Sequence, residues 1–183
     1  MKQLDGTGMK RLHRETRRKT TARLAMMVEG VQGPFSLGAI IRTAAAYRVE
    51  HLWIAATETT PDNTKVGKTA LGTDRYVEWT ACETSAEAMR LARAAGFRLV
   101  AIELADGAVP LDRLDLNPPT CLVVGHEDRG VTAATLAAVD HVAYLPQLGK
   151  VGSLNVATAA SIAMYEARRQ HLAESDDVRE VTS

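Results

Sequence analysis

The chain has 183 residues, of which 46% are hydrophobic, and its equal numbers of basic and acidic residues give a formal net charge of zero. This length and apolar content predict about one domain with a sizeable core, which excludes a disordered protein. No apolar run approaches the roughly 20 residues that a membrane-spanning helix needs. The first residues also lack the apolar stretch of a secretory signal. We therefore expect a cytoplasmic protein. Its two cysteines, Cys82 and Cys121, lack metal-ligand spacing, so we expect neither a metal site nor a disulfide.

The zero net charge conceals a basic N-terminal arm, residues 1–23, which holds eight basic and two acidic residues. Two interpretations remain open for it. It is either a solvated surface helix or a segment that contacts nucleic-acid phosphates. In the second case Arg14, Arg17 and Arg18 are candidate contacts. The arm holds no aromatic residue, so any contact would be to phosphate and not through stacking on bases.

After the arm, apolar runs alternate with helical patterns. We expect strands at residues 24–28, 52–56, 76–79, 97–104, 121–124 and 142–145, and helices at residues 37–47, 85–95, 132–139 and 155–173. Ser36 is the expected N-cap of the first of these helices. The alternation predicts an α/β domain with a mostly parallel sheet at residues 24–171, followed by a polar tail, residues 172–183, that we expect to be disordered.

Several common sites are missing from the sequence. No G-x-G-x-x-G follows the first strand, and no phosphate-binding G-x-x-x-x-G-K-[ST] is present. No cluster of histidine and cysteine has zinc spacing, and no G-x-S-x-G marks a hydrolase nucleophile. An ordinary dinucleotide site, a P-loop NTPase and a serine hydrolase are therefore disfavoured.

Two glycine-rich loops are the most informative feature of the sequence. The first, GHEDRG, follows the strand expected at residues 121–124, and the second, PQLGKVGSLN, follows the strand at residues 142–145. Repetition of strand, loop and helix places both loops at the carboxyl edge of a parallel sheet. Open α/β sheets bind their ligands at that edge.

Each candidate residue has a functional and a structural interpretation. Arg42 lies in a helix of small and apolar residues, where it either grips a phosphate or covers apolar surface with its stem. Glu127 either bonds a ligand or shapes a polar turn. Ser153 and Asn155 open the last helix, where each is either part of an anion or ligand site or simply an N-cap.

Taken in order, three segments resemble a known family. LGAIIRTAAA, VVGHEDRGVT and LPQLGKVGSLNVATAASIAMYEA are similar to the three motifs of the SpoU, or TrmH-type, RNA 2′-O-ribose methyltransferases of the SPOUT superfamily. The third segment is the most specific, and the resemblance covers roughly residues 24–171.

The resemblance implies a deep trefoil knot near the C-terminus, a homodimer, and S-adenosylmethionine as cofactor. Its motif positions imply cofactor binding at Ile102, Gly125, Leu145 and Leu154. They imply catalytic roles for Arg42, Glu127, Ser153 and Asn155. The implied reaction is methyl transfer to a ribose 2′-hydroxyl, which makes RNA the partner.

The residues of the motifs, together with the basic arm, most resemble those of the tRNA guanosine members of the family, so we expect a tRNA substrate. An rRNA substrate is the alternative. The sequence departs from the family in two places. Ser36 stands where the family has Asn, and Arg48 stands where a Gly is usual. These departures leave open a third possibility, an RNA-binding homologue without activity.

Overall fold

A computed structural model describes residues 2–181, with side chains as far as Glu174. Seven strands form a single sheet in the order β3-β2-β1-β6-β4-β7-β5, and every neighbouring pair is parallel. The strands are β1 (Leu24–Glu29), β2 (His51–Ala55), β3 (Glu78–Cys82), β4 (Arg98–Ile102), β5 (Val109–Pro110), β6 (Thr120–Val124) and β7 (His141–Tyr144). The prediction of an α/β domain with a mostly parallel sheet is confirmed.

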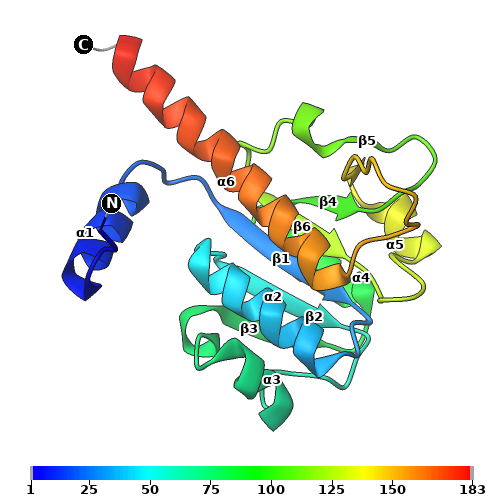
Figure 1. Cartoon of the computed structure of the whole chain (residues 1–183). Helices are drawn as coiled ribbons and strands as arrows, with labels where there is room; N and C mark the ends of the chain where they lie inside the picture. Colours follow the sequence, from blue (N-terminus) through cyan, green and yellow to red (C-terminus); the bar gives the residue numbers. More distant parts are fainter. Residues whose placement is uncertain (1, 182–183) are drawn as a thin grey trace.

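Helices cover both faces of this sheet (Figure 1). Side chains of α2 and α6 pack on one face, and side chains of α4 and α5 pack on the other. Helix α1 lies outside these layers and buries none of its residues. The helices are α1 (Gly6–Arg17), α2 (Pro34–Ala46), α3 (Thr64–Ala70), α4 (Ser85–Ala94), α5 (Ala133–Ala138) and α6 (Val156–Val181), with short 3-10 turns η1 (Asp74–Tyr76) and η2 (Leu111–Arg113).

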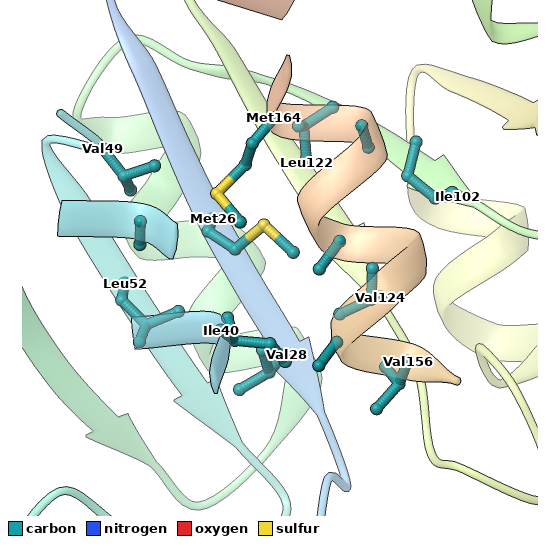
Figure 2. Packing of buried hydrophobic residues seen from close by; sticks show 14 of the residues in the cluster. Met26, Val28, Ile40, Val49, Leu52, Ile102, Leu122, Val124, Val156 and Met164 are labelled. Carbon is teal, nitrogen blue, oxygen red and sulfur yellow. The ribbon is translucent and has the colours of Figure 1, made fainter. Parts of the chain in front are cut away.

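The core follows from the alternation of side chains along the central strand β1. Met26 and Val28 point toward α2 and α6, whereas Ala25 and Met27 point to the opposite face. Figure 2 shows Met26 packed beside Met164 of α6. A strand buried on both faces needs an apolar residue at every position, which explains the unbroken run LAMMV at the start of β1.

The structure differs from the predicted strands in two places. The third strand was expected at residues 76–79, but β3 occupies Glu78–Cys82, because the residues before it form η1 and pairing with β2 begins at the register His51↔Glu78. The two-residue strand β5 was not predicted. A strand of two residues is too short to give a recognisable apolar pattern in the sequence. Pro110 is tolerated in β5 because this strand lies at the edge of the sheet.

Two helix boundaries also differ. Helix α2 begins at Pro34 with Gly33 as its N-cap, so the expectation that Ser36 caps it is wrong. Proline fits the first turn of a helix, where its missing N–H is not needed. The helix therefore begins at Pro34, three residues before the expected start at residue 37. Helix α6 continues to Val181, past the expected end at residue 173, so residues 174–181 are helical in the structure. No Gly or Pro occurs after Gly152 to stop it.

Arg168 joins three segments at the end of the core opposite the glycine-rich loops. Its guanidinium donates hydrogen bonds to the backbone oxygens of Ala22, Tyr47 and Arg48. Burial, assisted by the nearby charge of Arg48, lowers the pKa of Arg168 to about 10. Arg168 therefore connects α6 both to the end of α2 and to the residues that lead from the arm into β1.

The strand order places the carboxyl ends of β4, β6 and β7 side by side. The loops that follow these three strands therefore start from one edge of the sheet. The trefoil knot that the resemblance implies stays a prediction.

Candidate functional site

A cavity of about 350 Å³ lies at the carboxyl ends of β4, β6 and β7. Its walls come from the residues after β4, from the loop after β6 and from the loop that leads from β7 into α6. The four positions expected to bind a cofactor, Ile102, Gly125, Leu145 and Leu154, all line it. The structure therefore brings together four residues that are spread over 53 positions of the sequence.

The loop after β6, residues 125–132, folds back on itself. The backbone N–H of His126 donates to Gly130 O at 3.0 Å, and the N–H of Gly130 donates to His126 O at 2.9 Å. A Cβ atom at Gly125 would collide with the backbone of Gly130 and Val131. Glycine at position 125 is therefore required by the close approach of the loop's two ends.

Glu127 connects this loop to the start of α2. Its carboxylate accepts hydrogen bonds from the backbone N–H of Gly33 at 2.9 Å and of Gln32 at 3.3 Å. Burial opposes ionisation, but the backbone N–H groups of Glu127, Gly33 and Gln32 and the nearby His126 hold the pKa of Glu127 below its ordinary value. A carboxylate at the N-terminus of a helix also interacts favourably with the helix dipole.

Two further carboxylates fix the end of the same loop, and the sequence analysis missed both. Glu103, which lines the cavity after β4, accepts a hydrogen bond from Val131 N at 2.8 Å. Glu29, at the end of β1, accepts one from the next amide, Thr132 N, at 2.9 Å. An acidic residue directly after an apolar strand is the signal that could have identified them.

Glu29 is buried, with 3% of its surface exposed. Burial alone would raise its pKa, but hydrogen bonds from the side chains of Ser85 and Thr135 and from the backbone and side chain of Thr132 lower the pKa of Glu29. The hydroxyls of Ser85 and Thr135 each lie 2.6 Å from the carboxylate. The ionised carboxylate thus ties the end of β1 to the first turns of α4 and α5.

The four candidate catalytic residues are not all in one place. Glu127 and Ser153 line the cavity. Asn155 caps α6, because its side-chain oxygen accepts hydrogen bonds from Ala157 N at 3.0 Å and Thr158 N at 3.3 Å. Arg42 is exposed on α2 and, in the part of the chain that the structure describes, is not among the residues that line the cavity.

Helix α2, which carries Arg42, is nonetheless held in register with α6. The hydroxyls of Thr43 and Ser161 lie 3.1 Å apart, and they join the residue after Arg42 to the second turn of α6. Glu127 fixes the other end of α2. The position of Arg42 relative to the cavity is therefore set by contacts from the first glycine-rich loop and from α6, which follows the second.

Within the arm, the helix α1 extends from Gly6 to Arg17. Asp5 caps α1, and its carboxylate accepts a hydrogen bond from Gly8 N at 2.8 Å. Arg14, Arg17 and Arg18 are all exposed at the end of α1. A helix without buried residues presents these guanidinium groups to any polyanion that approaches.

Comparison with known proteins places the chain in a family. A family model described as the SpoU rRNA Methylase family matches residues 23–165. Among curated relatives, an uncharacterised tRNA/rRNA methyltransferase of Synechocystis sp. is 34% identical over 84% of this chain and 56% of its own length. The tRNA (guanosine(18)-2′-O)-methyltransferase of Escherichia coli is 33% identical over 80% of this chain and 63% of its own. A 23S rRNA (guanosine-2′-O-)-methyltransferase of Acinetobacter baylyi is 31% identical over 81% of this chain and 60% of its own length.

Solved structures agree with these relatives. The AdoMet-bound rRNA methyltransferase from Sinorhizobium meliloti superposes with a TM-score of 0.75 at 30% identity, over 82% of this chain and 57% of that one. The TrmH/SpoU tRNA modifying enzyme of A. aeolicus superposes with a TM-score of 0.74 at 26% identity, over 91% of this chain and 85% of that one.

The chain spans about three fifths of the length of the curated relatives reported above. Within the described residues, no helix is long and apolar enough to cross a membrane. The family model covers most of the chain, and the cavity lies where its glycine-rich loops meet. The chain belongs to the SpoU rRNA methylase family.

Proposed function

We propose that this protein transfers a methyl group from S-adenosylmethionine to a ribose 2′-hydroxyl of RNA, with tRNA as the favoured substrate. The observation that carries the proposal is the cavity at the sheet edge, which all four expected cofactor positions line. Relatives named as tRNA and as rRNA methyltransferases, and a structural neighbour that is AdoMet-bound, support the same chemistry.

The residues that line the cavity suit this cofactor. Ile102, Leu145 and Leu154 offer apolar surface for adenine, and the carboxylates of Glu103 and Asp128 offer partners for the ammonium group and hydroxyls. A volume of about 350 Å³ lies within the range typical of small-molecule sites. When bound, the cofactor supplies an electrophilic methyl group on a positively charged sulfur.

In this proposal the protein's own residues position the reactants. Glu127 is a poor base because its pKa is lowered, and its carboxylate is already engaged by the amides that begin α2. Its role is to hold α2 against the cofactor loop. Arg42 remains charged at neutral pH. From its exposed place on α2 it acts on the RNA, by gripping the phosphate and stabilising the negative charge that develops on the 2′-oxygen as its proton passes to solvent water.

Ser153 and Asn155 have different parts in the proposal. Ser153 lines the cavity and can bond either the cofactor or the target ribose. Asn155 acts indirectly, because its side chain caps α6 and thereby fixes the segment that contains Ser153 and Leu154.

The substitution at Ser36 is compatible with an active enzyme. Ser36 lies in the first turn of α2, whose N-cap is Gly33, and the helix start is held by Glu127. The loss of an Asn side chain here therefore does not deprive the helix of its cap. This argues against the alternative of an inactive RNA-binding homologue.

We favour tRNA because the basic arm, with Arg14, Arg17 and Arg18 exposed at the end of α1, offers phosphate contacts next to the methyltransferase domain. The arm comprises residues 1–23, the methyltransferase domain residues 24–171 and the tail residues 172–183. An rRNA substrate is the second candidate, since rRNA methyltransferases occur among relatives of similar identity. We also propose a homodimer and a cytoplasmic location.

The test is methyl transfer from labelled S-adenosylmethionine to unmodified tRNA and, in parallel, to rRNA, followed by nucleoside mass spectrometry. A 2′-O-methylnucleoside in tRNA alone is the expected product. Product in rRNA alone would select the second candidate. Cofactor binding without product in either RNA would favour the inactive homologue.

A further inference from the structure

Phe35 is an exposed aromatic residue on the helix that carries Arg42. It lies in the first turn of α2, and 65% of its surface is exposed. The chain has two phenylalanines, and the other, Phe97, is buried as this residue type usually is. Single exposed apolar residues are common on protein surfaces, so exposure alone assigns no role to Phe35. Its place relative to Arg42 and to the cavity is more informative.

Phe35 and Arg42 lie on the same face of α2. Seven residues separate them, which is close to two helical turns and about 10 Å along the helix axis. Both residues are exposed. Ala39 is the residue between them on this face, and it has a single methyl group as its side chain. The helix therefore places no bulky side chain between the ring and the guanidinium.

This face of α2 begins at the end of the domain that holds the cavity. The hydroxyls of Thr43 and Ser161 lie 3.1 Å apart, and the rings of Tyr47 and Tyr165 form an edge-to-face pair. Successive turns of α2 thus meet successive turns of α6, so the two helices run in the same direction (Figure 1). Val156, the first residue of α6, lines the cavity. The first turns of both helices therefore lie toward the cavity.

The backbone around Phe35 is held in place by the protein itself. The backbone N–H of Gly33 donates to Glu127, which lines the cavity, and Pro34 restricts the backbone directly before Phe35. A phenylalanine ring has only two rotatable side-chain bonds, so ordering it against a ligand costs less conformational entropy than ordering a long flexible side chain. Phe35 is therefore a preorganised apolar surface at the cavity end of α2.

The neighbouring charge indicates which ligand this surface suits. Arg42 offers a guanidinium, which binds phosphate well, and Phe35 offers a flat apolar ring. Each nucleotide of RNA carries both complements, a negative phosphate and a flat base. Proteins that bind single-stranded RNA stack unpaired bases on aromatic side chains. A second copy of this chain would need an acidic side chain opposite Arg42 as well as an apolar one opposite Phe35.

Resting on the proposed function, we propose that Phe35 stacks on the base of the target nucleotide while Arg42 holds its phosphate. The ribose joins these two groups, so it is held between them along α2, at the end of the domain where the cavity lies. Phe35 is then a substrate-positioning residue. Because every base has a π-face, stacking orders the nucleotide without selecting one base over another.

The test measures binding and methylation of a fluorescently labelled, unmodified tRNA transcript by the full chain, by F35L and by F35W. Leucine keeps apolar bulk and removes the flat ring, whereas tryptophan keeps a ring that can stack. Arg90→Gln is the control, because Arg90 is exposed on α4, which packs on the opposite face of the sheet. A second transcript lacks the base of the methylated nucleotide, whose position is first mapped by mass spectrometry.

We expect F35L to weaken tRNA binding and to raise the KM for tRNA by about fivefold to a hundredfold, as for the loss of one stacked base. F35W should stay within about twofold of the unaltered chain. On the transcript without the base, F35L and the unaltered chain should bind equally. The ring is uncharged, so F35L should keep the salt dependence of the unaltered chain.

The folded protein and its cofactor site should not change in F35L. Phe35 is exposed and does not belong to the described lining of the cavity, so the melting temperature and the affinity for S-adenosylhomocysteine should match those of the unaltered chain. Arg90→Gln should match it in every measurement.

Four outcomes would overturn the inference. Unchanged tRNA binding in F35L would show that the ring does not touch RNA. An equal loss in F35W, or a loss that persists on the transcript without the base, would show a contact other than stacking on the target base. A dimer that dissociates in F35L, measured by analytical ultracentrifugation, would assign the ring to a second copy. If the unaltered chain methylates no RNA, the proposed function fails, and this inference fails with it.

Discussion

The carboxylate of Glu127 accepts a hydrogen bond from the backbone N–H of Gly33 at 2.9 Å, between residues that lie 94 positions apart in the sequence. The bond joins the loop that lines the cavity to the start of the helix that carries Arg42. A side chain at Gly33 would collide with Glu127 Oε1, so the glycine permits this close approach. The loop that lines the cavity and the helix that carries Arg42 are thus directly connected.

Glu127→Ala is expected to lower the free energy of unfolding by about 1–3 kcal/mol, because it leaves the amides of Gly33 and Gln32 without their charged partner. Glu127→Gln, which keeps one acceptor oxygen, should lose less. Urea unfolding measures both. Asp128→Ala is the control, since Asp128 is the exposed neighbour in the same loop. Equal stability of the Glu127 and Asp128 variants would show that the bond to α2 contributes nothing.

Arg42→Ala is expected to abolish methyl transfer while S-adenosylhomocysteine binding changes less than about twofold. The reason is structural: Arg42 is exposed on α2 and does not belong to the described lining of the cavity. Single-turnover assays with saturating cofactor measure the first effect and calorimetric titration the second.

Arg48→Ala is a suitable control for Arg42→Ala only with care, because Arg48 has a left-handed φ of 52°. Arg90→Gln, at an exposed site on α4, alters one surface charge without that strain and is the better choice. Loss of cofactor binding in Arg42→Ala would assign Arg42 to the cofactor site, contrary to its place in the structure.

The sequence predicted those features that depend on one strand or loop at a time. The strand pattern placed the two glycine-rich loops at one edge of a parallel sheet, and the family resemblance supplied Ile102, Gly125 and Leu145 as the residues that converge there. Contacts between distant segments could not be predicted in this way. The bonds from Glu103 and Glu29 to consecutive amides of one loop depend on how three strands are ordered.

Local alternatives also remained open in the sequence. Asn155 could be a cap or a ligand, and the structure shows it capping α6. Ser36 looked like the N-cap of α2, but the N-cap is Gly33 and the helix begins at Pro34. Glu127, from another loop, accepts a hydrogen bond from the backbone N–H of Gly33. In both cases the residue type fits two environments, and only the neighbouring segments decide between them.

Neutralising the arm is expected to weaken RNA binding and to flatten its dependence on salt. With Arg14, Arg17 and Arg18 all replaced by Gln, the negative slope of log K against log salt should become less steep by roughly 2 to 3, at about 0.7 to 0.9 for each phosphate that is no longer neutralised. The residues are exposed on a helix that buries nothing, so the fold should be unaffected. Fluorescence anisotropy of labelled tRNA at several salt concentrations provides the slope.

Arg90→Gln again serves as the control, and its slope should equal that of the unaltered chain. An unchanged slope in the triple variant would show that the arm does not touch phosphate. The arm would then be the solvated helix that its charge alone could not exclude.

Stability is expected to decrease as pH falls through the range in which His171 titrates. This residue is 1% exposed; its Nδ1 lies 3.0 Å from Arg168 Nη1, and its Nε2 lies 2.8 Å from Leu116 O. Both contacts suit a neutral ring that donates from Nε2 and accepts at Nδ1. Burial, followed by the charge of Arg168, lowers the pKa of His171 below 6.5, although the bond to Leu116 and the acidic Glu174 and Asp115 oppose the shift.

Because the pKa of His171 is lower in the folded state than in the unfolded chain, the unfolded state binds the proton first as pH falls. The contribution of His171 to stability is therefore fully present above about pH 6.5 and is lost as pH falls through the lowered value. Glu29 and Glu127, like the other carboxylates whose pKa is lowered (Glu50, Asp140 and Glu166), lose their contributions only below an ordinary value of 4.5 or less. Unfolding free energies measured between about pH 8 and pH 5 thus report on the histidines, and His51, whose pKa is also lowered by burial, contributes in the same window as His171.

His171→Gln can accept from Arg168 and donate to Leu116 without titrating, so its stability should vary less with pH over this range than that of the unaltered chain. His13→Gln, on the exposed surface of α1, should leave the pH dependence unchanged. If His171→Gln shows the same slope as the unaltered chain, another group titrates in this window. The neutral ring between Arg168 and Leu116 would then not be what ties the end of α6 to the domain at neutral pH.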